Sequence, residues 1–92
     1  MEKLIANYRV IIEKENYENG EIVYVANAPT LGISDYGETI DEALKSIEKA
    51  IKFHLECLIN ENKAIPCPDE TNQIFVTNTK VEFFPKRKFT FA

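Results

Sequence analysis

The chain has 92 residues, of which 45% are hydrophobic and 28% charged, a composition that excludes disordered and collagen-like proteins. The net charge of −4 argues against a surface generally built to bind nucleic acid. The charge is uneven, because residues 1–70 carry seven basic and fourteen acidic groups (−7), whereas residues 71–92 carry four and one (+3). We expect a single domain over residues 1–92, with a core over residues 4–68 and a C-terminal β extension over residues 69–92.

The first part of the chain alternates between β-prone segments and turns. Residues 4–13 and 22–26 are rich in β-branched and aromatic side chains, which predicts two strands joined by a hairpin turn at the Asn-Gly dipeptide of residues 19–20. The second of these strands is apolar on both faces, which predicts a helix on one side and a partner or second layer on the other. After an interruption at residues 28–32, residues 33–36 predict a short third strand.

A long helix is predicted to follow the third strand. Thr39 and Glu42 have the spacing of a capping box, so the helix is expected to start at Thr39. From there to about residue 61 or 62, apolar residues recur every three or four positions, as one buried helix face requires. These residues are Ile40, Ala43, Leu44, Ile47, Ile51, Leu55 and Leu58. Pro66 prevents continuation of the helix.

The rest of the chain favours β structure. Residues 73–77 and 80–84 read as strands, and residues 89–91 follow the basic cluster of residues 85–88. The predicted fold is therefore α+β in the order β-β-β-α-β, with one long helix packed on a small, mostly antiparallel sheet. A basic cluster in this position more often protects an exposed edge strand from wrong pairing than binds phosphate.

Phe53 lies well off the apolar stripe of the predicted helix, on a flank that includes Cys57. An aromatic side chain in this position needs a second cover. One interpretation is that the phenylalanines of the C-terminal segment fold over it within the same chain. In the other interpretation the flank is a subunit or partner interface. The candidate interface residues are then Phe53, Cys57, Phe84 and Phe89.

Catalytic and metal-binding patterns in the sequence are weak. His54, Cys57 and Cys67 offer at most three ligands to zinc, and their spacing matches no common zinc module. Glu13 and Asp35, on two predicted strands, are the carboxylates considered for a metal-dependent nuclease. We predict that the protein is not an enzyme and has no metal and no cofactor.

The sequence predicts a cytoplasmic protein. No run of apolar residues approaches the length of a membrane span, and the first seven residues lack the basic, apolar and small-residue segments of a signal peptide. The two cysteines are expected to be reduced in that compartment.

Taken in order, these motifs resemble the HicB antitoxin family. The family pattern is an aromatic-x-Val first strand, a second strand ending near a proline, a leucine-glycine turn, and Gly-x-Thr-x-x-Glu-Ala at the start of a long helix with a later Ala-Ile. The matching residues are Tyr8, Val10, Tyr24, Val25, Pro29, Leu31, Gly32, Gly37, Thr39, Glu42, Ala43, Ala50 and Ile51. The resemblance covers residues 6 to about 68. The motif residues expected to have a structural role are Pro29, Gly32, Gly37, Thr39, Glu42 and Ala43.

The resemblance implies a partial RNase H-like fold without the catalytic carboxylates of that enzyme. It also implies a partner, a small HicA ribonuclease toxin whose active site the domain covers. Many family members carry a C-terminal DNA-binding domain as well. We expect a short member without one, because the 24 residues of 69–92 show no helical periodicity. A sheet with exposed edges and faces further predicts a homodimer or higher homo-oligomer.

Two alternatives remain open at the level of sequence. One is a divergent metal-dependent nuclease of RNase H-like fold, and the other is a nucleic-acid-binding regulator that uses the basic C-terminal tail. The acidic body favours a basic protein partner over nucleic acid. The leading hypothesis is therefore a non-catalytic antitoxin domain.

Overall fold

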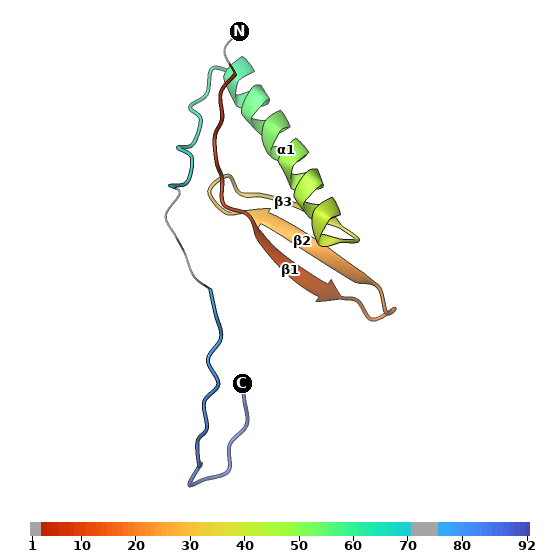
Figure 1. Ribbon diagram of the computed structural model, residues 1–92, viewed down its shortest axis with the longest axis vertical. Coiled ribbons are helices and arrows are strands. Elements are labelled where there is room, and N and C mark those ends of the chain that lie inside the picture. Colours follow the sequence, from red (N-terminus) through yellow and green to blue (C-terminus); the bar gives the residue numbers. More distant parts are fainter. Residues whose placement is uncertain (1–2, 71–75) are drawn as a thin grey trace.

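The structure is a computed structural model that describes residues 3–70 and 76–92. These residues form β1 (Ile11–Asn16), β2 (Ile22–Ala28), β3 (Ile33–Gly37) and α1 (Ile40–Asn60). The strands are antiparallel in the order β1-β2-β3, and α1 lies across one face of the sheet (Figure 1). The predicted α+β class and the order β-β-β-α are confirmed, whereas the RNase H-like label stays a prediction.

The register of β1 on β2 corrects the limits of the first predicted strand. Ile11 pairs with Asn27, and β2 ends at the next residue, directly before Pro29. The expected strand residues that precede Ile11 therefore have no ladder partner in β2. They run beside α1 instead (Figure 1), while the other end of β1 continues to Asn16, further than predicted.

The hairpin turn between β1 and β2 lies where the sequence predicts it. Gly20 has a φ of 88°, in the left-handed region that favours glycine. Its N–H donates to the Tyr17 carbonyl at 3.0 Å, and the Tyr17 N–H donates to the Glu21 carbonyl at 2.8 Å. The Asn19 side chain accepts a further bond of 3.0 Å from the Glu21 N–H. These bonds confine the turn to residues 17–21, so that β1 can extend to its observed end.

The start of α1 agrees with the predicted capping box, and its end agrees with the predicted limit near residues 61–62. Thr39 is the N-cap, and its hydroxyl accepts a hydrogen bond of 3.1 Å from the Glu42 N–H. The Glu42 carboxylate reaches back and accepts a bond of 3.0 Å from the Glu38 N–H. Glu61 is the C-cap. Within the described residues, no helix is long and apolar enough to span a membrane.

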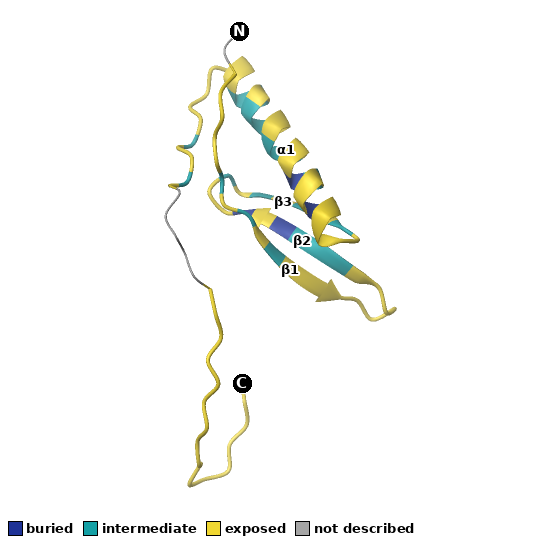
Figure 2. Ribbon diagram, viewed as in Figure 1, coloured by how far each residue is buried: buried dark blue, intermediate teal, exposed yellow. Residues whose placement is uncertain are grey.

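The core lies between α1 and one face of the sheet, and it is thin (Figure 2). Its fully buried residues are Ala26, Ala28, Ala43 and Ile47, and the partly buried apolar residues around them are Val10, Ile12, Tyr24, Ile33 and Ile51. Only part of the predicted helix stripe is covered, because Ile40 is 50% and Leu44 41% exposed. The short sheet shields the centre of the stripe and leaves apolar surface at its margins.

The C-terminal segment does not form the predicted additional strands. Residues 80–84 and 89–91 are not in a strand, and part of the predicted segment 73–77 lies outside the described residues. Residues 76–92, which we call the C-terminal arm, are exposed throughout, point away from the sheet and double back near residues 86–87 (Figure 1). A strand needs a paired neighbour, and the arm has no ladder partner within the described part of the chain. The resulting radius of gyration is 18.7 Å, against about 12 Å for a compact domain of this length.

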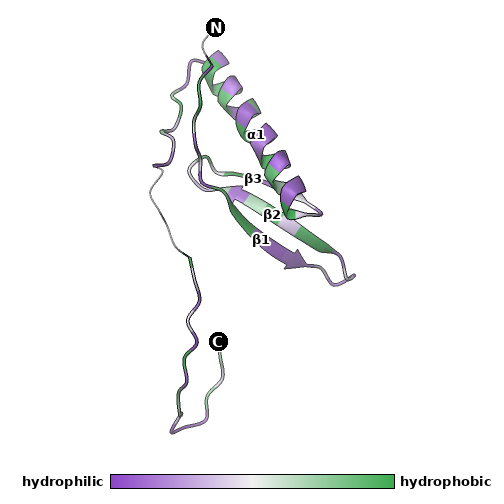
Figure 3. Cartoon of the chain, in the orientation of Figure 1, coloured by the Kyte–Doolittle hydropathy of each residue, from purple (hydrophilic) through white to green (hydrophobic). Residues whose placement is uncertain are grey.

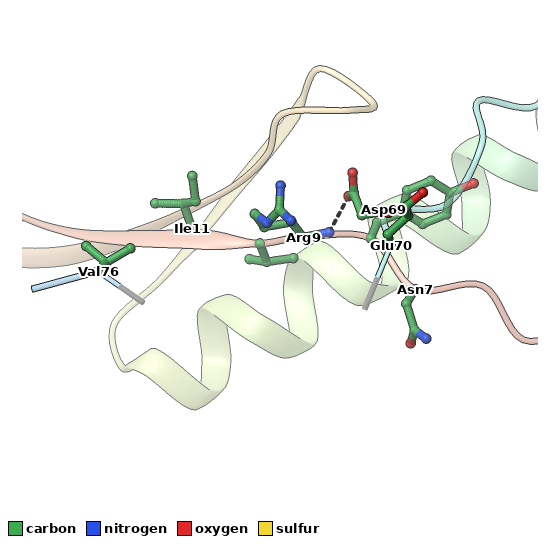
Figure 4. A pocket seen from close by; sticks show the side chains of 8 residues that line it. Asn7, Arg9, Ile11, Asp69, Glu70 and Val76 are labelled. Carbon is green, nitrogen blue, oxygen red and sulfur yellow. Dashed lines mark hydrogen bonds between the residues drawn. The ribbon is translucent and has the colours of Figure 1, made fainter. Parts of the chain in front are cut away.

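Asp69, nine residues after the end of α1, ties three segments together. Its N–H donates to the Asn7 carbonyl at 2.9 Å. Its carboxylate accepts a bond of 2.6 Å from the Arg9 N–H (Figure 4). It accepts another of 2.6 Å from the Thr30 hydroxyl. We call these bonds the Asp69 clasp, because they hold the chain after α1 to the segment before β1 and to the β2–β3 turn.

The clasp follows the hydrogen-bond pattern of a parallel β-bridge with one substitution. In such a bridge the N–H of one residue donates to the carbonyl of the residue before the one opposite it. Its carbonyl accepts from the N–H of the residue after the one opposite it. Asp69 bonds both sides of Tyr8 in this way, but its carboxylate replaces its carbonyl as the acceptor from Arg9. Tyr8 adds a hydroxyl bond of 2.7 Å to the Pro66 carbonyl. The chain after α1 therefore begins to pair beside β1 without forming a strand.

We expect Asp69→Asn to destabilise the fold in a pH-dependent way. The bonds from the Arg9 N–H and then the Thr30 hydroxyl hold the pKa of the Asp69 carboxyl below its ordinary value of 3.8. A carboxylate with a lowered pKa stabilises the folded state above the ordinary pKa, and this contribution is lost as the pH falls through the lowered pKa. In urea unfolding, the deficit of the variant should be largest at pH 7 and should shrink below about pH 4.

Glu56→Gln is the matched control for this experiment, because it removes a carboxylate from the exposed surface of α1. Its unfolding free energy should stay within about 0.5 kcal/mol of the parent at every pH. A deficit of Asp69→Asn that stays constant from pH 7 to pH 3 would show that the charge of Asp69 does not contribute.

Candidate interaction surface

The face of the sheet opposite α1 has the character of an interface. The strand register places Glu13, Val25 and Tyr36 in one row across it and Ile11, Asn27 and Ser34 in the next. We call this surface the open face. Ile11 is 46% and Tyr36 67% exposed, and Val25 between the strands is partly buried. A shallow hollow of about 260 Å³ lies along it, and residues of both rows line it. They are Ile11, Glu13, Val25, Asn27 and Ser34, together with Glu15.

The open face combines an apolar centre with acidic groups. Ile11, Val25 and Tyr36 supply the apolar contacts, and Glu13 and Glu15 place two carboxylates on β1. Figure 3 shows the same gradient, with β1 changing from hydrophobic at its start to hydrophilic toward its end. Protein interfaces typically have an apolar centre and a polar rim, and carboxylates on that rim select partners with basic groups. The surface therefore suits a basic protein.

Sequence reasoning found the signal for this surface but not its members. It predicted that β2, apolar on both faces, needs cover on both sides. It did not single out Ile11, Asn27 or Ser34, because their common face depends on the strand register. The Asp69 clasp was missed as well, since its partners lie 39 and 60 residues away in the chain.

The two carboxylates considered for nuclease chemistry do not converge. Glu13 pairs with Val25, whereas Asp35 pairs with Ala26. Neighbouring residues of a strand point to opposite faces, so Glu13 lies on the open face and Asp35 on the side of α1. Metal-dependent nuclease chemistry requires carboxylates that meet at one point. The pair on which the nuclease alternative rested is therefore absent.

His54, Cys57 and Cys67 are not brought together as a zinc site. Across residues 3–70 and 76–92, no three His, Cys, Asp or Glu side chains lie close enough to hold a metal ion. Both cysteines are free, with Cys57 partly buried on α1 and Cys67 exposed in the segment that follows. The described residues thus offer no ligand set for zinc.

The four candidate interface residues from the sequence fall into two separate places. Phe53 is 69% exposed on α1, so the C-terminal arm does not cover it, and Cys57 follows one turn later. Phe84 and Phe89 lie in the arm, which extends away from α1 (Figure 1). Phe84 is 90% exposed, whereas Phe89 contacts Phe83 at a ring-centroid distance of 5.5 Å. A role of these residues in an interface stays a prediction.

The six motif residues occupy two junctions that hold the sheet and helix in place. In the β2–β3 turn, Pro29 follows the last residue of β2, and Gly32 has a φ of 68°. The Gly32 N–H donates to the Ala28 carbonyl at 2.9 Å and closes this turn. The other four, Gly37, Thr39, Glu42 and Ala43, lie at the β3–α1 junction.

Gly37 is required at the β3–α1 junction by a close backbone approach. A Cβ atom at this position would lie 2.5 Å from the Ala43 nitrogen and 2.8 Å from the Glu42 carbonyl carbon. Both atoms belong to the backbone of the first helical turn and cannot move aside cheaply. Ala43 itself is fully buried against the sheet, where a larger side chain would push α1 away. The motif thus has a physical role in seating the helix.

Sequence comparison with known proteins places the chain in a protein family. The chain matches the family model of the HicB-like antitoxin of bacterial toxin-antitoxin systems over residues 8–83. It is similar to the UPF0150 protein ssr1765 of Synechocystis sp., with 40% identity over 68 residues that cover 73% of this chain and 81% of that protein. It is also similar to an uncharacterised 14.9 kDa protein in the rep-hol intergenic region of Haemophilus phage HP1, with 34% identity over 59 residues. That match covers 64% of this chain and 41% of the phage protein. The search of solved structures found no significant match.

We expect Gly37→Ala to lower the unfolding free energy by about 1–3 kcal/mol, the usual cost of overpacking a tight contact. The added methyl group collides with the helix backbone at Ala43, so α1 must shift on the sheet. Urea denaturation followed by circular dichroism measures the change. Glu38→Ala is the matched control, because it alters the exposed neighbouring residue and should cost less than about 0.5 kcal/mol. Equal stability of Gly37→Ala and the parent would contradict the close approach.

Proposed function

Because this chain belongs to the HicB-like antitoxin family of bacterial toxin-antitoxin systems, we propose that it neutralises a HicA-type ribonuclease toxin by covering its active site. Family membership supports an antitoxin role and a toxin partner in general. The identity of the toxin as a HicA-type ribonuclease comes from the resemblance of the sequence motifs. In this proposal the domain acts by occlusion in the cytoplasm, without catalysis and without a cofactor.

The observation that carries the proposal is the open face. The sheet is backed by α1, and the apolar centre of its open face around Val25 and Tyr36 suits close contact with another protein. Glu13 and Glu15 add negative charge, and the whole chain has a net charge of −4. A ribonuclease that binds RNA needs a basic surface, so opposite charges would speed encounter and fix orientation.

The proposal includes self-association of the antitoxin. Apolar side chains are exposed on both α1 and the arm. They include Leu44, Val81, Phe84 and Phe91, which are 41–90% exposed. A monomer of this size rarely leaves so much apolar surface in contact with water. A homodimer or higher homo-oligomer would cover part of that surface.

The test compares two exposed aromatic residues on different surfaces. Tyr36 on the open face is 67% exposed and Phe53 on α1 is 69% exposed, so both tolerate substitution equally well. We expect Tyr36→Lys to weaken binding of a small basic toxin encoded beside this chain by at least about tenfold, because it places a positive charge against a basic partner. Phe53→Lys should bind like the parent. Co-purification and calorimetric titration measure both variants.

Inhibition of RNA cleavage provides the functional readout. The parent chain should abolish cleavage by the co-expressed partner at equimolar concentration, and Tyr36→Lys should restore it at low micromolar concentration. Failure of the parent chain to bind or inhibit the neighbouring protein would overturn the proposed function. Loss of binding in Phe53→Lys with normal binding in Tyr36→Lys would instead place the toxin on α1 and contradict the assignment to the open face.

A further inference from the structure

The C-terminal arm has the composition of a pairing strand but no strand to pair with inside the described chain. Val81 and Phe83 alternate with Lys80 and Glu82, which is the period of a strand with one apolar side. Phe83, Phe89 and Phe91 form a three-ring cluster with centroid distances of 5.2–6.4 Å, which holds the two legs of the arm together. Even so, Phe83 is 52% and Phe91 84% exposed. The arm is shaped for docking and is not docked on its own body.

The outer edge of β1 is the place on the body that is prepared for an extended segment. β1 is at the edge of the sheet, with β2 on one side only. The Asp69 clasp shows that the same edge, at Asn7 and Arg9, already receives an extended segment in parallel orientation. Val76, at the root of the arm, lines a hollow of about 520 Å³ with Arg9 and Ile11 (Figure 4). The bonds to Asn7 and Arg9 therefore place an extended segment on this edge just before the start of β1.

Charge distinguishes this edge from the rest of the sheet. Residues 11–21, which form β1 and its turn, contain Glu13, Glu15, Glu18 and Glu21 against Lys14, a net charge of −3. Residues 76–92 contain Lys80, Lys86, Arg87 and Lys88 against Glu82, a net charge of +3. β3, on the other edge, has only the single charge of Asp35. The arm and the β1 hairpin are therefore complementary in charge as well as in backbone hydrogen bonding.

We propose that the C-terminal arm of one copy of this chain pairs with the free edge of β1 in a second copy, and that the exchange is reciprocal. This inference rests on the self-association part of the proposed function and is independent of toxin binding. The second copy is favoured over the same chain because the C-terminal arm extends away from its own sheet (Figure 1). Exchange of an identical segment also satisfies both copies at once. The pairing uses the edge of β1 and leaves the open face accessible.

The experiment places a spin label on the arm and observes a different copy of the chain. The spin label is attached at Val81→Cys in a chain that also carries Cys57→Ser and Cys67→Ser and contains no ¹⁵N. This chain is mixed in equimolar amount with the ¹⁵N-labelled parent chain. Any signal loss in the ¹⁵N copy is then intermolecular. We expect a stronger loss of amide signals from residues 11–16 than from residues 33–37, because β3 lies two strands further from the arm. A label at Lys52→Cys, on the exposed surface of α1, is the matched control and should spare both segments.

Light scattering on the same full-length chain gives the assembly mass and separates the two parts of the proposal. A mass of twice the 10.6 kDa chain, with signal loss strongest at residues 11–16, supports arm exchange. The same mass with signal loss stronger at residues 33–37 than at residues 11–16, or with none from the arm label, overturns arm exchange and leaves self-association intact. A monomeric mass overturns both, and none of these outcomes bears on toxin binding.

A charge-reversal pair tests the complementarity. Lys86→Glu combined with Lys88→Glu should convert the dimer to monomer, because the arm then repels the acidic hairpin. Lys49→Glu combined with Lys52→Glu makes the same change in net charge on α1 and should leave the mass unchanged. Equal effects of the two double variants would show that only net charge matters and would contradict a specific arm site.

Discussion

The fold depends on the short connection between β3 and α1. β3 ends at Gly37 and α1 begins at Ile40, so two residues must turn the chain from the sheet onto its face. The Thr39 cap satisfies the first helical turn, and the absence of a side chain at Gly37 lets that turn approach the strand closely. This junction decides which face of the sheet α1 covers. By the alternation of the strands, it also decides that Glu13, Val25 and Tyr36 stay on the other side.

A core built in this way is small. Three of its four fully buried residues are alanines, and Ile47 is the only large side chain among the described residues that is fully buried. Burying one isoleucine contributes only about 2–3 kcal/mol, so the apolar surface left on α1, the open face and the C-terminal arm is a large share of what the chain could bury. Binding partners add to stability when they bind only the folded state. A domain of this design therefore gains stability from the same surfaces that serve its function.

Much of the fold follows from local signals in the sequence. The capping box fixed the start of α1, the Asn-Gly dipeptide located the first turn, and β-branched segments located β2 and β3. The extent of β1 could not be predicted in the same way, because it depends on where β2 stops before Pro29. The β-like pattern of the arm describes what its backbone can do, but a strand also requires a partner, and residues 76–92 have none in the described part of the chain.

The interaction surface was less accessible to sequence reasoning than the fold. An apolar pattern on both faces of β2 indicated that a partner is needed, yet the members of the open face come from three strands and are assembled only by register. Phe53 could be identified from helix geometry because its environment depends on one element. The Asp69 clasp depends on three distant segments and has no local signature.

The central claim is that a sheet backed by one helix presents its opposite face to a toxin. Amide hydrogen exchange of the full chain, with and without the co-purified basic partner, tests it most directly. We expect slower exchange in the three strands on binding, centred on the row of Glu13, Val25 and Tyr36, with the exposed surface of α1 unchanged. Slower exchange confined to α1, with the strands unaffected, would contradict it.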